Sequence, residues 1–298
     1  MTAGRAANPA SPRRRFTGSG GVVLAAEVWG APDAPPLVLL HGGGQTRGAW
    51  GTAGRRLAAR GWRVVAADLR GHGQSGWSPD GSYDIDLFAD DVRALVAALG
   101  GRPVLVGASL GGLSSLLAAG EAPRAAVRAL VLVDVAHRPD PAGARRILDF
   151  MAARPDGFSS LDEVADAVAA YLPHRRRPEA LDGLRRNLRR EGARWVWHWD
   201  PRLLKRLADS IHPAGAAARD QAAARHLAAA RAAGVPILLV RGAISDVVPE
   251  AIAAEFCVSV PCVHRVEVAG AGHMVAGDRN EHFIEAILPF LTRIREST

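Results

Sequence analysis

A serine flanked by glycines is the most reactive candidate in this chain of 298 residues. Ser109 lies in the sequence Gly-Ala-Ser-Leu-Gly at 107–111, between the apolar run 104–107 and a segment with helical spacing that starts at Leu110. A buried strand that turns this sharply into a helix leaves no room for side chains on either side, and glycine supplies that room. The pattern predicts a nucleophile elbow with Ser109 in a strained backbone conformation, and the alternative is a glycine-rich turn with an incidental serine.

Serine becomes a nucleophile only when a base removes its proton, so the elbow requires a histidine and an acid further along the chain. The expected order is serine, acid, histidine. His273 lies in a glycine-rich loop after the last predicted strand, and Asp246 lies in the loop after the strand at 235–240. Active-site groups of parallel sheets gather at such carboxyl ends of strands. We therefore assign the acid to Asp246, with Asp134, directly after the strand at 129–133, as its rival.

The tetrahedral intermediate of acyl transfer carries an oxyanion, which backbone N–H groups fixed in a tight turn can stabilise. One predicted donor is the N–H of Leu110, at the N-terminus of the helix after the elbow. The other is expected from the sequence His-Gly-Gly-Gly at 41–44, with Gly43 as the donor. We interpret His41, like His72 in the sequence Gly-His-Gly, as a structural residue whose ring organises its loop rather than as a proton carrier.

The elements that must position these residues alternate between strand and helix. This alternation predicts a parallel sheet covered by helices on both faces. It breaks after the sixth strand, where the sequence is helical and rich in arginine, and we interpret this part as an inserted cap. The predicted domains are a flexible N-terminal tail at 1–15, a core formed by 16–137 and 215–298, and a helical cap at 138–214. The predicted strands lie at 21–29, 37–40, 63–67, 104–107, 129–136, 235–240 and 263–268.

Composition limits the classes of partner. Hydrophobic residues make up 48% of the chain and charged residues 22%, as in ordinary globular proteins. The formal net charge is +7, but the arginines are spread along the chain, so we expect no nucleic-acid partner. No Cys and His spacing matches a zinc site. No apolar run is long enough to span a membrane, so we expect a cytoplasmic monomer or homodimer that acts on a small molecule.

Five motifs occur in an order that resembles the α/β-hydrolase superfamily: LLHGGG with Trp50 downstream, DLRGHGQS, VGASLGG, RGAISDVV and GAGHMVAGD. The resemblance covers residues 20–295. It implies a mostly parallel eight-stranded sheet with helices on both faces and a helical lid over the pocket. It also implies a catalytic triad of Ser109, Asp246 and His273, and no metal or organic cofactor. Because this fold supports many chemistries, the resemblance does not define the substrate.

The residue at position 109 separates some of these chemistries. The motifs DLRGHGQS and GAGHMVAGD also resemble those of epoxide hydrolases and dehalogenases, but these subfamilies place an aspartate at the elbow. Serine favours attack on a carbonyl carbon, so we expect an ester or lactone hydrolase that forms an acyl-enzyme. The alternatives are thioester cleavage, carbon–carbon bond hydrolysis or perhydrolysis by the same triad, and a non-catalytic receptor for a small molecule.

Aromatic residues of the cap are the first candidates for the substrate pocket. Trp195, Trp197 and Trp199 alternate with strand spacing, so an extended segment places them on one face. There they either pin the cap to the core or line an apolar pocket. The other candidate pocket residues lie beside the predicted catalytic loops and are His41, Gly42, Trp50, Asp134 and Met274.

Overall fold

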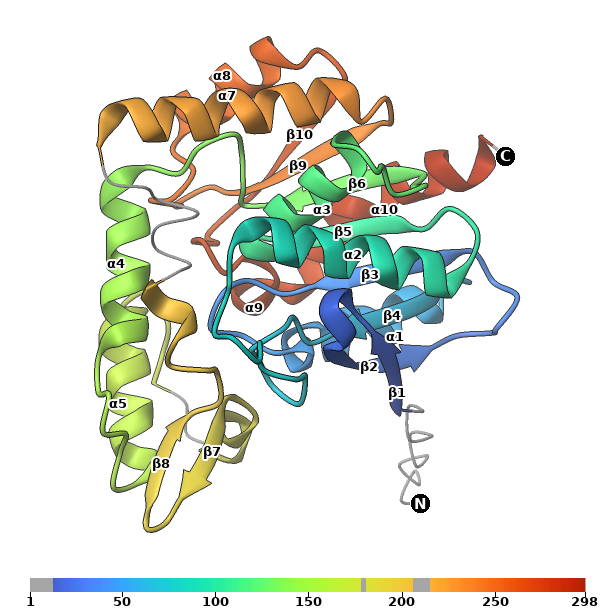
Figure 1. Ribbon diagram of the computed structural model, residues 1–298. Coiled ribbons are helices and arrows are strands. Elements are labelled where there is room, and N and C mark those ends of the chain that lie inside the picture. The colour runs from blue at the N-terminus through green and yellow to red at the C-terminus, as the bar shows by residue number, and fades with distance from the viewer. Residues whose placement is uncertain (1–12, 178–180, 206–214, 298) are drawn as a thin grey trace, which may run out of the picture.

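The computed structural model describes residues 13–177, 181–205 and 215–297, and its centre is an eight-stranded sheet (Figure 1). The strand order is β1-β2-β4-β3-β5-β6-β9-β10. The pairs β1–β2 and β2–β4 are antiparallel and all other neighbours in the sheet are parallel, which confirms the predicted mostly parallel sheet. The strands are β1 (Arg13–Thr17), β2 (Val23–Trp29), β3 (Pro36–Leu40), β4 (Arg63–Ala67), β5 (Val104–Ala108), β6 (Ala129–Val133), β9 (Ile237–Gly242) and β10 (Val263–Val268).

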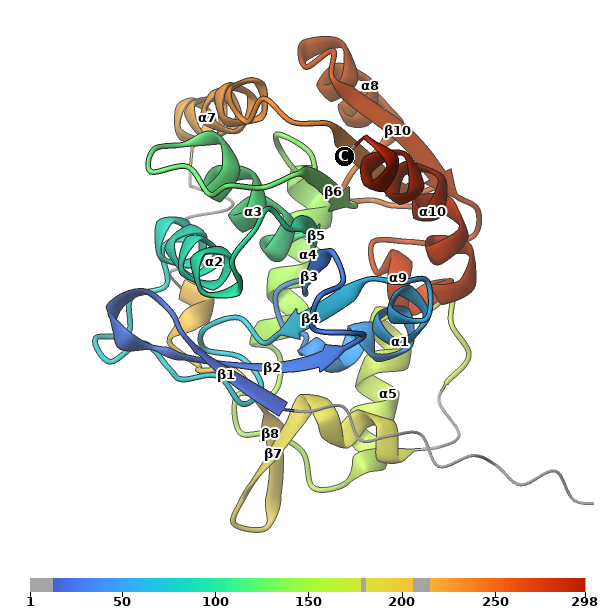
Figure 2. The ribbon, with the colours of Figure 1, turned by 90° about the vertical axis from the view of Figure 1, so that its right-hand side faces the viewer.

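Helices cover both faces of this sheet, as Figure 2 shows. Buried residues of one strand alternate between the two helix layers: Val38 and Leu40 of β3 join one core, and Leu37 and Leu39 join the other. A strand buried on both faces must be apolar along its whole length, which explains the continuous apolar runs of the sequence. One layer contains α2 (Ile85–Leu99), α3 (Leu110–Gly120), α7 (Ala216–Ala232) and α8 (Glu250–Ser259), and the other contains α1 (Gly51–Ala58) and α10 (Asn280–Glu296). Three short turns of helix complete the core: η1 (Ser19–Gly21), η2 (Arg47–Trp50) and α9 (Val275–Asp278).

Between β6 and α7 the chain leaves the sheet and forms the segment that the sequence predicts to be a cap, of which residues 178–180 and 206–214 lie outside the described part. Its helix α4 begins where the Asp140 carboxylate accepts hydrogen bonds from the N–H groups of Ala142 and Gly143. The expectation of a purely helical cap is wrong, because two of its strands pair as an antiparallel hairpin. Alternating aromatic and β-branched residues favour a strand there. The elements of the cap are α4 (Pro141–Ala152), α5 (Leu161–Tyr171), η3 (Leu181–Asn187), β7 (Leu188–Glu191) and β8 (Arg194–Trp197).

The N-terminal edge of the sheet also differs from the prediction. The tail was expected to extend to residue 15, but Arg13–Thr17 forms β1, in which Arg13 pairs with Glu27. Phe16 of this strand packs against the hydrophobic core, which gives the segment a reason to be ordered. The predicted edge strand at 21–29 is therefore the second strand of the sheet, and the rest of the predicted tail, residues 1–12, lies outside the described residues.

Candidate active site

The turn between β5 and α3 holds Ser109 with φ 45° and ψ −114°. Such a positive φ is strained for any residue other than glycine. Two glycines permit the turn, because a Cβ atom on Gly107 would lie 2.4 Å from the Gly111 carbonyl oxygen, and one on Gly111 would lie 2.6 Å from that of Leu40. The predicted elbow geometry is confirmed, and it presents the Ser109 side chain at the end of the strand.

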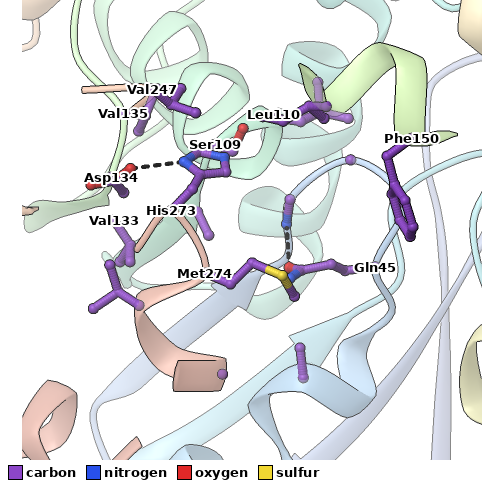
Figure 3. A pocket seen from close by; sticks show the side chains of 18 of the residues that line it. Gln45, Ser109, Leu110, Val133, Asp134, Val135, Phe150, Val247, His273 and Met274 are labelled. Atoms are coloured by element: carbon purple, nitrogen blue, oxygen red, sulfur yellow. Dashed lines mark hydrogen bonds and ion pairs between the residues drawn. The ribbon is translucent and has the colours of Figure 1, made fainter. Parts of the chain in front are cut away.

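His273 approaches this serine from the loop after β10, and its acid partner is Asp134. The His273 Nδ1 atom lies 2.8 Å from Asp134 Oδ2. Figure 3 shows the Ser109 side chain beside the His273 ring, on the side away from Asp134. Since Nδ1 carries the proton that is donated to the carboxylate, Nε2 is left as the basic nitrogen that can accept a proton from a serine hydroxyl.

Asp134 is completely buried and its carboxylate is held by three donors. Besides His273, the Gly242 N–H donates to Oδ1 at 2.9 Å and the Ser245 hydroxyl donates to Oδ2 at 2.5 Å. Its backbone has φ 49°, so a second strained residue lies at this site. A buried carboxylate with several donors keeps a single orientation, which is what a residue that orients a histidine requires.

The prediction that Asp246 is the acid partner of His273 is wrong. Asp246 is held by the cap instead, where Arg146 of α4 donates from Nε at 2.7 Å and from Nη2 at 2.8 Å to the two carboxylate oxygens. Although partial burial opposes it, this ion pair lowers the pKa of Asp246. The physical reason is the turn after β9: the Ser245 N–H bonds to the Gly242 carbonyl, so that Ser245 faces Asp134 while the next side chain points to the cap.

The loop at 41–44 is fixed by two histidine rings, as the sequence predicts. His41 accepts a hydrogen bond from the Leu69 N–H at Nε2 and donates from Nδ1 to the Gly42 carbonyl, at 3.0 and 2.8 Å. His72 accepts from the Gly44 N–H at Nε2, at 3.2 Å. Burial lowers the pKa of both histidines to about 3, so both rings are neutral near pH 7 and act as structural hydrogen-bonding groups.

Gly43 and Leu110, the two predicted oxyanion donors, both line the cavity in front of Ser109. Leu110 is the first residue of α3, where backbone N–H groups have no partner within the helix. The loop that carries Gly43 is held further by Gln45, whose Oε1 accepts the Gly42 N–H at 3.1 Å (Figure 3). Both predicted donors thus belong to turns that border the same cavity as Ser109.

The cavity has a volume of about 420 Å³, and its wall is mostly apolar. Core loops and the cap both contribute to it, so a small ligand would be enclosed between them. Of the predicted pocket residues, the cavity is lined by Gly42, Trp50, Asp134, Trp197, Trp199 and Met274. Trp197 and Trp199 stack with ring centroids 5.0 Å apart, so these two large side chains form one rigid aromatic surface.

Two predicted pocket residues lie elsewhere. The described residues that line the cavity do not include His41, which is buried behind the glycine loop, or Trp195. Trp195 lies on β8, where the guanidinium groups of Arg185 and Arg190 lie 5.0 and 4.8 Å from its ring centroid. The alternation of the tryptophans predicts all three on one face. The hairpin β7–β8 extends away from the sheet (Figure 1), and Trp195 is nearer to its turn than Trp197, so Trp195 does not reach the cavity.

Sequence reasoning missed three residues of the site. Gln45 accepts a hydrogen bond from Gly42, Ser245 donates one to Asp134, and His226 of α7 lines the cavity. Ser245 immediately precedes the predicted acid in the sequence, so its loop was identified but not its side chain. His226 stands alone in an alanine-rich helix and carried no motif.

Within the described residues, no group of three or more His, Cys, Asp or Glu side chains is arranged to hold a metal ion. None of the helices in the described part of the chain has both the length and the apolar character to cross a membrane.

Comparisons with known proteins agree with this geometry. Residues 35–279 match the family model of the alpha/beta hydrolase fold. The chain is 32% identical to an esterase from Mycobacterium tuberculosis over 275 residues, which cover 89% of this chain and 85% of the relative. It is 30% identical to the 3-hydroxybutyrate-oligomer hydrolase of Cupriavidus necator, covering 84% of this chain and 86% of that protein.

Among solved structures, E-2-(acetamidomethylene)succinate hydrolase superposes with a TM-score of 0.81 at 24% identity and covers 95% of this chain and 99% of its own. At this identity the likeness shows the fold alone.

Proposed function

Since the chain belongs to the α/β-hydrolase family, we propose that it is a serine hydrolase that cleaves a carboxylic ester or lactone of a small, largely apolar substrate. The observation that carries this proposal is the His273–Asp134 hydrogen bond of 2.8 Å beside a serine on a strained elbow. The relatives named as an esterase and as a 3-hydroxybutyrate-oligomer hydrolase support hydrolysis of this kind.

The first half of the proposed reaction forms an acyl-enzyme. Ser109 Oγ attacks the ester carbonyl carbon while His273 Nε2 takes the hydroxyl proton. The carbonyl electron pair moves to oxygen, and the N–H groups of Gly43 and Leu110 stabilise the resulting oxyanion. When the carbon–oxygen double bond re-forms, the bond to the leaving alcohol breaks and His273 gives that oxygen its proton.

The second half returns the free enzyme. A water molecule attacks the acyl carbon and gives its proton to His273, and the collapse of the second tetrahedral intermediate returns that proton to Ser109 as the acid leaves. Asp134 stays ionised throughout. It holds the ring of His273 and stabilises its protonated form, while Ser245 and Gly242 hold Asp134 in turn.

The cap is part of the proposal, because it closes the cavity over the nucleophile. We propose that the cap, residues 138–214, selects the substrate, with Trp197 and Trp199 in contact with its apolar part. The ion pair between Arg146 and Asp246 joins this cap to the loop that carries Ser245.

The experiment that tests the proposed nucleophile is labelling with a fluorophosphonate probe followed by intact-mass analysis. The wild type is expected to gain one adduct and Ser109→Ala none, since the probe reacts with an activated serine. A panel of 4-nitrophenyl esters and lactones of increasing chain length then defines the substrate. An adduct that persists in Ser109→Ala, or no adduct on folded wild type, would contradict the proposal.

A further inference from the structure

His226 is a buried histidine on the cavity wall that the proposed reaction does not use. It lies on α7 and is 5% exposed, and it lines the same cavity as Ser109. The mechanism needs one histidine, which is His273. An imidazole in a mostly apolar wall costs desolvation free energy unless both of its nitrogens have hydrogen-bond partners.

The packing of α7 brings His226 to this wall. Ala223, Ala229 and Ala230 are buried on the same side of the helix, three or four residues from His226. The helix lies so close to α3 that a Cβ atom on Gly120 would lie 2.1 Å from the Ala229 carbonyl oxygen. The small residues therefore fix the position of the helix, and His226 is the large polar residue on its buried side.

One hydrogen bond determines the tautomer of His226. Its Nδ1 atom lies 2.7 Å from the His137 carbonyl oxygen. A carbonyl only accepts, so Nδ1 carries the proton and Nε2 is an acceptor with a lone pair. Burial lowers the pKa of His226, so the ring is neutral near pH 7. Nothing in the described part of the chain donates a hydrogen bond to Nε2.

We propose that His226 Nε2 accepts a hydrogen bond from an O–H or N–H group of the substrate. Part of the substrate's carbon chain separates this group from the scissile ester. The inference rests on the proposed ester hydrolysis and narrows its substrate class to esters that carry a hydroxyl or amide N–H group. A substrate without such a group displaces water from Nε2 and leaves a buried acceptor unpaired, which lowers its affinity.

The test compares esters that differ only in this donor. The matched pairs are 4-nitrophenyl 3-hydroxybutyrate and butyrate, 6-hydroxyhexanoate and hexanoate, and N-acetylglycinate and 4-oxopentanoate. In the wild type at least one donor ester is expected to exceed its partner about tenfold or more in kcat/KM, the effect of one buried hydrogen bond.

Two variants remove the acceptor in different ways. His226→Asn retains an amide N–H close to the position of Nδ1, so the bond to His137 can form, but it lacks Nε2. His226→Phe keeps the size of the ring. Both are expected to abolish the advantage of the donor ester, because the KM of that ester rises more than the KM of its donor-free partner. His264→Phe, at an exposed position on β10, serves as the matched control.

The outcomes separate this inference from the proposed function. No advantage in the wild type, or an advantage that survives in the folded His226→Asn or His226→Phe variant, overturns the role of His226 while hydrolysis itself stands. If the wild type hydrolyses no ester, the proposed function fails. The role of His226 is then decided by calorimetric binding of the same ester pairs to wild type and His226→Asn, which requires no turnover.

Discussion

Asp134 and Asp246 follow the neighbouring strands β6 and β9, yet only Asp134 faces His273. The difference arises from the turn after β9, in which the Ser245 hydroxyl accepts the N–H groups of Val247 and Val248 and donates to Asp134. This arrangement directs Ser245 inward and Asp246 toward Arg146. A single position in a turn thus decides which of two carboxylates meets His273.

Exchange of each acid for its amide tests this assignment. Asp134→Asn is expected to lower kcat by about 10⁴, because the amide cannot orient and stabilise the protonated ring of His273. Asp246→Asn is expected to keep kcat within about threefold, since its ion pair is half exposed and contributes little. Rates on a 4-nitrophenyl ester and melting temperatures of both variants give the answer. If Asp246→Asn lost activity and Asp134→Asn kept it, Asp246 would be the acid partner of His273.

The sequence located the serine of the strained turn and the histidine beside it, but it named the wrong acid as the partner of that histidine. Ser109 and its glycines form a motif whose spacing is dictated by steric exclusion, so the turn could be predicted from residue types alone. His273 could be predicted to lie near Ser109 because it follows the last strand of the chain, at the same edge of the sheet as the serine. The direction of an acidic side chain depends on hydrogen bonds within a four-residue turn, and two acids at adjacent strand ends could not be separated without those bonds.

At the scale of elements, the cap helix α4 lies directly against the loop that supports the catalytic acid. A Cβ atom on Gly143 would lie 2.3 Å from the Asp246 carbonyl oxygen, so this contact is between one backbone and another. The Asp140 N–H also donates to the Val247 carbonyl at 2.8 Å. Movement of α4 is therefore coupled to the turn that places Ser245 against Asp134.

Gly143→Ala is expected to push α4 away from this loop and to lower kcat/KM about tenfold, because small displacements of catalytic groups are costly. The matched control is Gly183→Ala, since nothing lies within 4 Å of a Cβ atom at that position. Ester hydrolysis and circular dichroism are measured for both. Equal activity of the two variants would show that the cap can shift without disturbing the acid.

The elements that sequence patterns predicted best are those of the two-sided core. Strands such as β3 and β5 are continuous apolar runs, because both of their faces are buried under helices. The hairpin β7–β8 and the edge strand β1 were missed. Both are rich in arginine and lie at the surface, where composition carries little information about pairing partners that are distant in the sequence.

At the scale of the whole molecule, three buried histidines link the core loops to the cap. The ring centroids of His41 and His72 lie 5.1 Å apart, and those of His72 and His198 lie 5.8 Å apart. His198, from the cap, accepts the Gly73 N–H at Nδ1, at 2.6 Å. Burial lowers the pKa of all three to about 3, so each ring remains neutral in the folded state until the solution is strongly acidic.

This lowering predicts a loss of stability in mild acid. An unfolded chain binds a proton at each of these histidines below about pH 6.5, whereas the folded chain does not until about pH 3. The neutral rings therefore make their full contribution to the free energy of unfolding above pH 6.5. This free energy is expected to fall by about 2 kcal/mol per histidine by pH 5. Urea unfolding at pH 8, 6.5 and 5 measures this fall, and the exposed-site variant His264→Gln should leave it unchanged. A midpoint that stays constant from pH 8 to pH 5 would show that the rings are not held neutral.

Among the described residues the sheet ends in β1 on one side and β10 on the other, and each of these strands pairs there with one neighbour. Exposed charged side chains occupy both: Arg13, Arg14 and Arg15 on β1, and Arg265 and Glu267 along β10. An incoming strand from another molecule would have to strip water from these groups before it could form backbone hydrogen bonds. Charged side chains at both edges therefore oppose the growth of this sheet into a longer intermolecular one.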